Sequence, residues 1–315
     1  MTARPLDFLA LFALGVGWGL TMPLAKVAVS TGHQPYGLIF WQLVIVVAVL
    51  APLAWLTGRR VALRPRHLVL FVVIALTGAV LPDVFFYLAA SKLPAGVLSI
   101  ALAAAPLFSM PIALALGTDA FTWPRLAGLT MGMAGIVLMI GPKTSLPDPE
   151  MSGFVLVALL APALYATEGN VVAKWGTGGL DPFSTIVGAS VVGAVITLPL
   201  ALLSGQWINP LAAFGRAEAA LVAGAATHGL VYAAYVWLVG RAGSVFAAQS
   251  AYLTTAFGVI WSMTLLGERY SPFVWASLVL LLIGIFFVQP RPRIGLAPAA
   301  GMGKYEPRRE RDGPG

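Results

Sequence analysis

The sequence of 315 residues contains no cysteine and only three histidines. Without cysteine the chain has no disulfide, no thiol nucleophile and no thiolate ligand for a metal. Charged residues make up 10% of the chain, whereas a soluble domain usually carries about 25%. By contrast, 59% of the residues are hydrophobic and the mean hydropathy is +0.89. A soluble core of this size has no room for so much apolar surface, so we expect most of the chain to lie in lipid.

Motifs for enzymatic chemistry are also missing. The chain has no Gly-x-x-x-x-Gly-Lys-Ser/Thr loop for ATP phosphates and no His-Glu-x-x-His helix for zinc. The three histidines, His33, His67 and His228, are widely separated. We therefore expect no catalytic residue, no metal and no cofactor. An intramembrane lipid-modifying enzyme remains a distant alternative, and a scaffold or receptor is disfavoured because there is no sizeable soluble domain.

Long apolar runs dominate the sequence, and a helix needs about 20 apolar residues to cross the hydrocarbon core of a bilayer. The runs predict an all-α integral membrane protein with ten transmembrane helices. The predicted segments are 7–27, 36–56, 67–90, 95–117, 123–141, 152–173, 182–204, 218–240, 243–266 and 272–289.

The sequence also repeats itself at an offset of about 149 residues. Asp119 falls on Glu268, Thr122 on Ser271 and Gly135 on Gly284, while Lys26 falls on Lys174 at nearly the same offset. The repeat predicts one five-helix unit over 1–145 and a second over 150–290, followed by a disordered basic tail over 291–315. Because five is odd, the second unit enters the membrane inverted, and we expect the two units to surround a central cavity.

The basic residues predict the orientation. With the N-terminus in the cytoplasm, thirteen Lys and Arg fall on the cytoplasmic side and four on the other. We therefore expect a multi-pass protein of the cell inner (plasma) membrane with both termini cytoplasmic. The net charge of +7 comes largely from one loop, 59–66, and from the tail after Pro290, both next to predicted spans. This placement indicates contact with the lipid bilayer and no nucleic-acid partner.

Polar and aromatic residues recur inside the predicted spans, where ionisable groups are expensive and normally face the bundle interior or a wet cavity. On four spans such residues share one helical face: Asp83, Phe86 and Tyr87; Tyr165 and Glu168; His228, Tyr232 and Tyr235; Gln249 and Tyr252. The repeat superposes Asp83 on Tyr232 and Phe86 on Tyr235. We interpret these faces as the lining of an aromatic cavity with a few hydrogen-bonding groups.

Each of these residues also has a structural interpretation. Glu168 lies near the end of its span, where it is either a cavity or coupling residue or the partner of Lys174. His228 is either a proton relay or a packing residue. Lys26 and Lys174 end the first spans of the two units, where a lysine normally extends to the interface. Their matched places in the repeat add a functional role as an alternative to this default.

A family resemblance rests on features in both units. They are Trp18-Gly19 and Lys26, Tyr87, Leu93–Val97, Pro106, Gly128, Gly135, Asp119 and Gly267-Glu268. Combined with the ten spans and the inverted duplication, they resemble the drug/metabolite transporter superfamily, EamA type, over residues 7–289. The resemblance implies a ten-helix bundle with a central cavity and alternating access. It also implies movement of a small molecule across the inner membrane, often the export of amino acids or other metabolites.

Three places differ from the pattern of that family. Asp119 replaces the more usual Glu, and Trp41-Gln42 stands where the second span often has an Arg. Tyr165-Ala166 is kept in the sixth span, but Glu168 and Asn170 are additions. The resemblance gives the two loop acids a helix-end or loop-locking role rather than a substrate-binding one.

The sequence thus predicts a secondary transporter that moves an amino acid or similar amphipathic metabolite, most simply as an exporter; an uptake carrier or exchanger of the same fold is the alternative. The small-residue motif Gly128-x-x-x-Gly132 leaves a homodimer open. The expected substrate-binding residues are Trp18, Phe86, Tyr87, Tyr165, Asn170, Tyr232, Tyr235, Gln249 and Tyr252. The expected coupling or gating residues are Glu168, Asp83, Lys26, Lys174 and His228.

Overall fold

The computed structural model describes residues 4–58, 64–212 and 214–288, and all regular structure within these ranges is helical. The helices are α1 (Pro5–Ala28), α2 (Pro35–Leu56), η1 (Pro65–His67), α3 (Leu68–Ala75), η2 (Leu76–Val80), α4 (Leu81–Lys92), α5 (Ala95–Leu102), α6 (Ala105–Ala115), α7 (Trp123–Ile140), α8 (Met151–Trp175), α9 (Pro182–Leu203), α10 (Arg216–Ala242), α11 (Ser244–Ala247), α12 (Ser250–Leu266) and α13 (Pro272–Val288). The all-α prediction is confirmed for these residues. The predicted tail, 291–315, lies outside them.

Within the described residues, eight helices or runs of helices are long and apolar enough to cross a membrane. They correspond to the first eight predicted segments, and the run Pro65–Lys92 contains η1, α3, η2 and α4. The last two segments, 243–266 and 272–289, coincide largely with α12 and α13, which are apolar but 17 residues long. A helix of that length spans roughly 26 Å at about 1.5 Å per residue, slightly less than a typical hydrocarbon core. Ten spans therefore stay a prediction.

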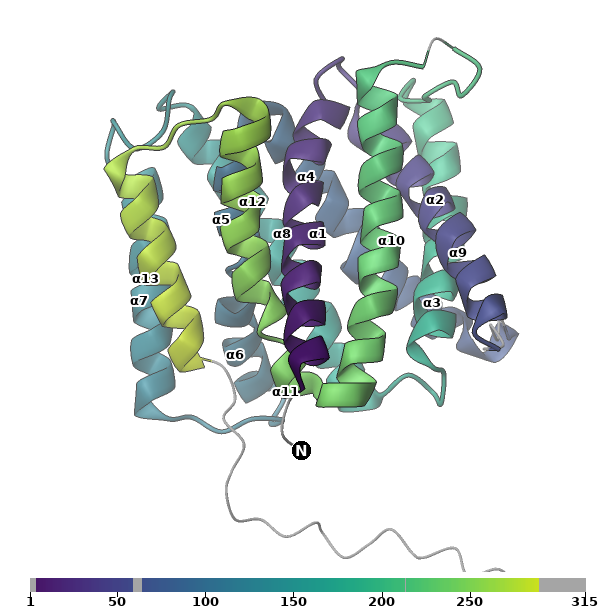
Figure 1. Cartoon of the computed structure of the whole chain (residues 1–315), viewed down its shortest axis with the longest axis horizontal. Coiled ribbons are helices and arrows are strands. Elements are labelled where there is room, and N and C mark those ends of the chain that lie inside the picture. The colour runs from purple at the N-terminus through teal and green to yellow at the C-terminus, as the bar shows by residue number, and fades with distance from the viewer. Residues whose placement is uncertain (1–3, 59–63, 213, 289–315) are drawn as a thin grey trace, which may run out of the picture.

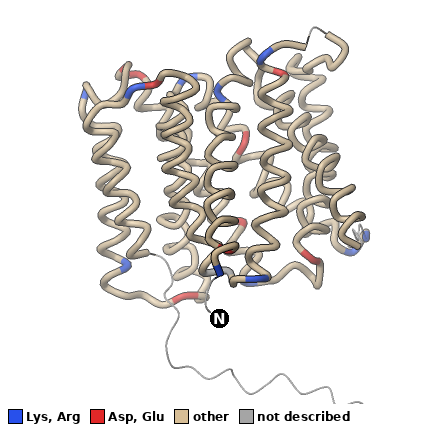
Figure 2. Tube along the Cα trace, viewed as in Figure 1, with Lys and Arg blue, Asp and Glu red and all other residues tan. Residues whose placement is uncertain are grey.

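The helices stand side by side as a bundle, and α1 begins at the end of the bundle where α13 finishes (Figure 1). We call this the N-terminal end. Lys, Arg, Asp and Glu gather at the two ends, with a few acidic residues between them (Figure 2). This distribution is the one that a lipid-embedded bundle requires, because charge is costly in hydrocarbon.

Local sequence explains where several helices start and stop. α1, α2, α9 and α13 each begin at a proline, whose fixed φ and missing N–H suit the first turn of a helix. At α9 the Asp181 carboxylate also accepts hydrogen bonds from the backbone N–H groups of Phe183 and Ser184, at 2.9 and 3.3 Å. α12 ends at Gly267, whose φ of 67° is the left-handed conformation that glycine adopts most easily.

Three of the runs are interrupted within the bundle. α5 and α6 are separated at Ala103 and Ala104, just before Pro106. Proline lacks an N–H, and its ring crowds the carbonyl four residues earlier, which interrupts the helix. A π-helical turn, η2, joins α3 to α4 just before Pro82. α11 and α12 are separated at Ala248 and Gln249. Each interruption lies at the cavities described below.

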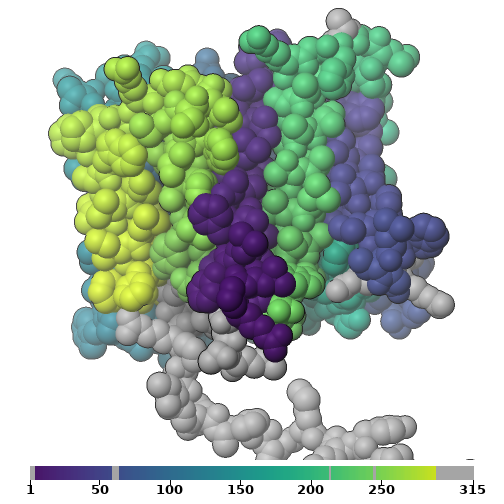
Figure 3. Space-filling view, in the orientation of Figure 1, coloured from purple at the N-terminus to yellow at the C-terminus, as the bar shows by residue number. Residues whose placement is uncertain are grey.

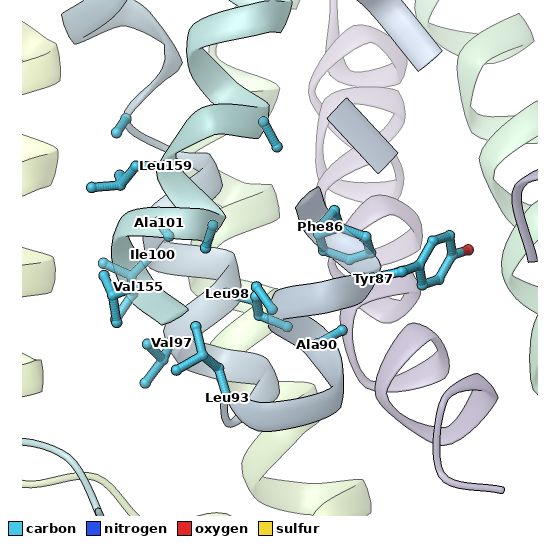
Figure 4. Close-up of a cluster of buried hydrophobic side chains, with 14 of the residues drawn as sticks. Phe86, Tyr87, Ala90, Leu93, Val97, Leu98, Ile100, Ala101, Val155 and Leu159 are labelled. Atoms are coloured by element: carbon cyan, nitrogen blue, oxygen red, sulfur yellow. The ribbon is translucent and has the colours of Figure 1, made fainter. Parts of the chain in front are cut away.

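Helices from residues 1–145 pack mainly against helices from residues 150–290. The principal contacts pair α7 with α13, α1 with α12 and α10, α2 with α9, and α4 with α8. In the space-filling view α1 fills the face between α12 and α10 (Figure 3). Figure 4 shows part of the buried core where α4, α5 and α8 meet, with Tyr87 pointing away from the cluster. Neither stretch of the sequence therefore forms a core of its own.

Close backbone contact joins α7 to α13. A β-carbon at Gly128 would lie 2.6 Å from the carbonyl oxygen of Gly284, and one at Gly284 would lie 2.7 Å from the backbone nitrogen of Gly132. Separations this short leave no room for a side chain. The Gly128-x-x-x-Gly132 motif therefore serves packing within the chain, between these two helices.

Candidate functional site

Three adjoining cavities run through the bundle. The central cavity, of about 260 Å³, is lined by residues of α1, α2, α4, α8, α9 and α10 among others. The broken-helix cavity, of about 620 Å³, is lined by the interruptions between α5 and α6 and between α11 and α12. The end cavity, of about 510 Å³, reaches Asp119, Arg125 and Val288 at the N-terminal end. Tyr165 lines all three, so its ring stands where they meet.

A hydrogen-bonded network surrounds Asp83 on the wall of the central cavity. The Tyr165 hydroxyl donates to Asp83 Oδ1 at 2.9 Å, and Gln42 Nε2 donates to Asp83 Oδ2 at 2.7 Å. The Tyr87 hydroxyl in turn donates to Gln42 Oε1. Asp83 is buried, and within the described ranges no Lys, Arg or His forms an ion pair with it. Three helices, α2, α4 and α8, thus hold one carboxylate with neutral donors alone.

Glu168 differs from Asp83 because its carboxylate has no hydrogen-bond or ion-pair partner among the described residues. It lines the broken-helix cavity, and its side chain lies against the π-helical turn: a β-carbon at Gly78 would be 3.1 Å from Glu168 Cγ. The alternative of a pair with Lys174 is wrong. Lys174 Nζ instead donates to the carbonyl of Leu116 at 3.0 Å and lies 5.2 Å from the centre of the Trp175 ring.

Aromatic rings form much of the remaining wall. The Trp18 and Tyr235 ring centroids are 5.4 Å apart, and Trp18 lies 6.3 Å from the ring of His228. Trp18 lines the central and broken-helix cavities, Tyr235 the broken-helix and end cavities, and His228 the central cavity. Phe86 and Tyr87 also line the central cavity, next to Asp83.

Several predicted site residues lie outside the lining of the three cavities. The Asn170 amide donates to Ser109 Oγ at 2.8 Å and to the carbonyl of Ala166 at 2.8 Å, which ties α8 to α6. Lys26 Nζ donates to the carbonyl of Ala90 at 2.7 Å, near the end of α4. Tyr232 packs against a cluster formed by α2 and α9. Gln249 sits at the interruption between α11 and α12, and the Tyr252 hydroxyl is buried without a partner in the described part of the chain.

Sequence reasoning missed other lining residues. Gln42 was visible as a polar residue in an apolar span, but its link to Asp83 depends on how α2 packs against α4. Ser250 and Thr254 share a face of α12 and line the broken-helix cavity. Hydroxyl residues are common in membrane helices, so no sequence signal separated these two from the rest.

Each end of the bundle has its own polar closure. At the N-terminal end Arg125 forms an ion pair with Asp119 at 2.6 Å and donates to the carbonyl of Val288 at 3.0 Å. At the opposite end Glu268 accepts from the backbone N–H groups of Ala95 and Gly96 at 2.8 and 3.2 Å. Both acids follow a helix-ending glycine with a left-handed φ, Gly117 or Gly267.

Tyr270 supports the second closure. Its hydroxyl donates to Glu268 Oε2 at 2.5 Å. Burial, together with this hydrogen bond, raises the pKa of Tyr270 well above its usual value. The phenol therefore keeps its proton and remains a donor to Glu268. The expected helix-end role of Glu268 is confirmed by these contacts.

Comparison with known families adds the decisive observation. The model of the EamA-like transporter family matches residues 6–141 and again residues 152–289. The chain belongs to the EamA-like transporter family. This EamA-like chain is also 23% identical, over 284 residues, to a protein of Streptantibioticus cattleyicolor (strain ATCC 35852 / DSM 46488 / JCM 4925 / NBRC 14057 / NRRL 8057) named "Probable terminal-alkyne amino-acid exporter". The match covers 90% of this chain and 93% of the relative.

A solved structure described only as "Crystal structure of protein" has the same fold as this EamA-like transporter. The TM-score is 0.60 at 17% sequence identity, and the match covers 91% of this chain and 98% of that one. The family and the name of the relative indicate a multi-pass membrane transporter of small metabolites rather than an enzyme. The cavities within the helical bundle are consequently the candidate path for a substrate.

Proposed function

We propose that the protein is a secondary transporter that exports an amino acid with an apolar side chain across the cell inner membrane. The observation that carries the proposal is the row of adjoining aromatic cavities, lined by the carboxylates of Asp83 and Glu168, inside a chain of a transporter family. The printed name of the relative supports an amino acid as the substrate and export as the direction.

The architecture proposed for this activity is ten spans in two inverted five-helix units, 1–145 and 150–290, around the cavities. Two separate matches to one family model support the duplication. The two loop acids, Asp119 and Glu268, occupy matched positions in the repeat and support it independently. The distribution of Lys and Arg supports cytoplasmic termini, which makes the N-terminal end of the bundle the cytoplasmic end.

The two closures support a mechanism of alternating access. In the proposed cycle the contacts of Arg125 with Asp119 and Val288 break when the cavities open to the cytoplasm. The contacts of Glu268 with the start of α5 break when they open to the outside. Asp83 and Glu168 are the candidates for the coupling group. A charged carboxylate is costly inside a membrane bundle, so gaining or losing a proton there changes the free energy of the protein substantially. His228, Lys26 and Lys174 are proposed as gating residues from their places on the cavity wall and at helix ends.

The test is an efflux assay. Cells are loaded with dipeptides, which intracellular peptidases hydrolyse, and amino acids are measured in the medium and in the cells. The wild type is compared with Ala251→Phe, which adds a phenyl ring to the lining of the broken-helix cavity, and with Met263→Phe, which places the same side chain at an exposed position on the same helix. Membrane abundance is checked by blotting.

Faster release of amino acids by the wild type and Met263→Phe, but not by Ala251→Phe or cells without the protein, would support the proposal. Equal release by all four would overturn it. A higher internal concentration in the wild type would replace export by uptake, the alternative within the same fold.

A further inference from the structure

We propose that the broken-helix cavity binds the two charged groups of an α-amino acid at opposite walls. The α-ammonium group binds at Glu168 on α8, and the α-carboxylate binds at the start of α12, beside Ser250 and Thr254. This inference rests on the proposed function and assigns residues to it.

The ammonium site follows from the isolation of Glu168. Its carboxylate lines the cavity and has no hydrogen-bond or ion-pair partner within the described ranges. A carboxylate in a low-dielectric bundle is stable only when it is paired, neutralised or solvated. The described residues that line this cavity include no Lys or Arg. We assign the cation that pairs with Glu168 to a ligand.

The aromatic wall suits the same group. Trp18, Tyr165 and Tyr235 line this cavity together with Glu168. The face of an aromatic ring attracts a cation, and the attraction strengthens when the cation leaves water. Asp83 does not compete for the ammonium group in the same way, because both of its oxygens already accept hydrogen bonds.

The carboxylate site is built from two hydroxyls on α12. Ser250 is the first residue of α12 and is 3% exposed, and its hydroxyl has no partner among the described residues. The Thr254 hydroxyl, one turn later, is buried and also has no partner there. Both residues line the cavity. A buried donor without an acceptor is costly, so the Thr254 hydroxyl indicates an acceptor from outside the chain, and the Ser250 hydroxyl one turn earlier is placed to donate to the same group.

The start of α12 adds a favourable field. The N-terminus of a helix carries free backbone N–H groups and a partial positive charge, which favour an anion. α12 has 17 residues and begins at the interruption that lines the cavity. Transporters with interrupted helices use such half-helix starts to bind anionic substrate groups.

The combination selects a zwitterion. A phosphate or dicarboxylate finds no Lys or Arg on the lining, an amine alone leaves the two hydroxyls unpaired, and a simple carboxylate alone leaves Glu168 unpaired. A molecule with one ammonium and one carboxylate satisfies both walls.

Binding of three related probes to the purified full-length protein in lipid nanodiscs tests the assignment. L-phenylalanine carries both groups, 2-phenylethylamine only the ammonium and 3-phenylpropionate only the carboxylate. Binding is measured by competition against tritiated L-phenylalanine and by direct titration of each probe. We expect L-phenylalanine to bind at least about tenfold more tightly than either fragment, because each fragment lacks one charge-assisted hydrogen-bond site.

The variants separate the two walls. Glu168→Gln is expected to weaken the binding of L-phenylalanine and 2-phenylethylamine by about tenfold or more and to leave the binding of 3-phenylpropionate unchanged. Ser250→Ala combined with Thr254→Val is expected to weaken the binding of L-phenylalanine and 3-phenylpropionate and to leave the binding of 2-phenylethylamine unchanged. Glu168→Asp, which keeps the charge, should retain the preference for the amine over the acid even if it binds less tightly. Gel filtration and thermal unfolding confirm that each variant is folded.

Equal effects of Glu168→Gln on the amine and on the acid would overturn the inference, as would no effect on any probe. A wild type that exports amino acids in the efflux assay but shows no dependence on Glu168, Ser250 or Thr254 would overturn the inference and leave the proposed function standing. A wild type that neither binds L-phenylalanine nor exports any amino acid would overturn both the inference and the proposed function.

Discussion

The Glu268 carboxylate accepts a hydrogen bond from the backbone N–H of Ala95 at 2.8 Å, although the two residues are 173 positions apart. The acid comes from the loop between α12 and α13, and the amide is the first of α5. A charged side chain from one part of the chain therefore caps a helix in another, and the Tyr270 hydroxyl holds that side chain in place at 2.5 Å.

Glu268→Ala is expected to destabilise the bundle by about 1–2 kcal/mol, the usual value of a helix cap. The apparent melting temperature of the purified protein should fall by several degrees. Glu150→Ala removes the same charge from an exposed position whose side chain makes no capping hydrogen bond, and should leave the melting temperature unchanged. If both variants melt together with the wild type, the cap does not stabilise α5.

Tyr165→Phe removes one of the two direct donors to Asp83 while keeping the ring that lines all three cavities. A hydrogen bond to a carboxylate contributes about 1.5–3 kcal/mol, so the variant should melt at a lower temperature and release amino acids severalfold more slowly. Tyr36→Phe is the matched control, because the Tyr36 hydroxyl has no hydrogen bond within the described residues. Normal melting and release by Tyr165→Phe would show that the Tyr165–Asp83 contact is dispensable.

Gly284→Ala places a methyl group 2.6 Å from the carbonyl oxygen of Gly128. Because that neighbour is backbone, α7 and α13 must move apart, and we expect a loss of about 1–3 kcal/mol and poor recovery from membranes. Gly240→Ala is the control, since a β-carbon there meets nothing within 4 Å and improves helix propensity. Equal recovery of the two variants in detergent would contradict the packing described for α7 and α13.

The lack of cysteine makes the wild-type chain a ready background for testing the orientation. Thr31→Cys and Thr57→Cys place single thiols at exposed positions beyond the two ends of α2. A membrane-impermeant maleimide should label Thr31→Cys in intact cells and Thr57→Cys only after the cells are permeabilised. The reverse pattern would place the N-terminus outside, and labelling of both in intact cells would argue that α2 does not span the membrane.

The sequence predicted the helices well because the signal is a large one: a run of about 20 apolar residues has few alternatives. It also grouped Asp83, Phe86 and Tyr87 correctly on one lining face, since one helical period decides that. It could not say that Tyr232 turns toward α2 and α9 while its neighbours His228 and Tyr235 face the cavities. That depends on how far α10 is rotated against its neighbours.

The partners of the carboxylates inside the bundle were harder to predict. Gln42 and Tyr165 approach Asp83 from 41 and 82 residues away, so only the packing of α2, α4 and α8 reveals the network. Lys174 lies six residues from Glu168, and their proximity in sequence suggested a pair that the helical geometry does not form. Oppositely charged side chains on one helix pair when they are three or four residues apart, and a separation of six residues is too large.

The interleaving of helices from 1–145 with helices from 150–290 has a consequence for biosynthesis. α1, α2, α4 and α7 find their main neighbours in helices that the ribosome makes later. During synthesis the early helices therefore lie in the bilayer before Asp83 and the face of α7 that contains Gly128 and Gly132 are covered by their later neighbours. Until α8 and the helices after it are made, lipid, the insertion machinery or chaperones must cover these surfaces. A chain truncated before α8 would remain a substrate for membrane proteases, and the two stretches, though similar in sequence, would mature only as one unit.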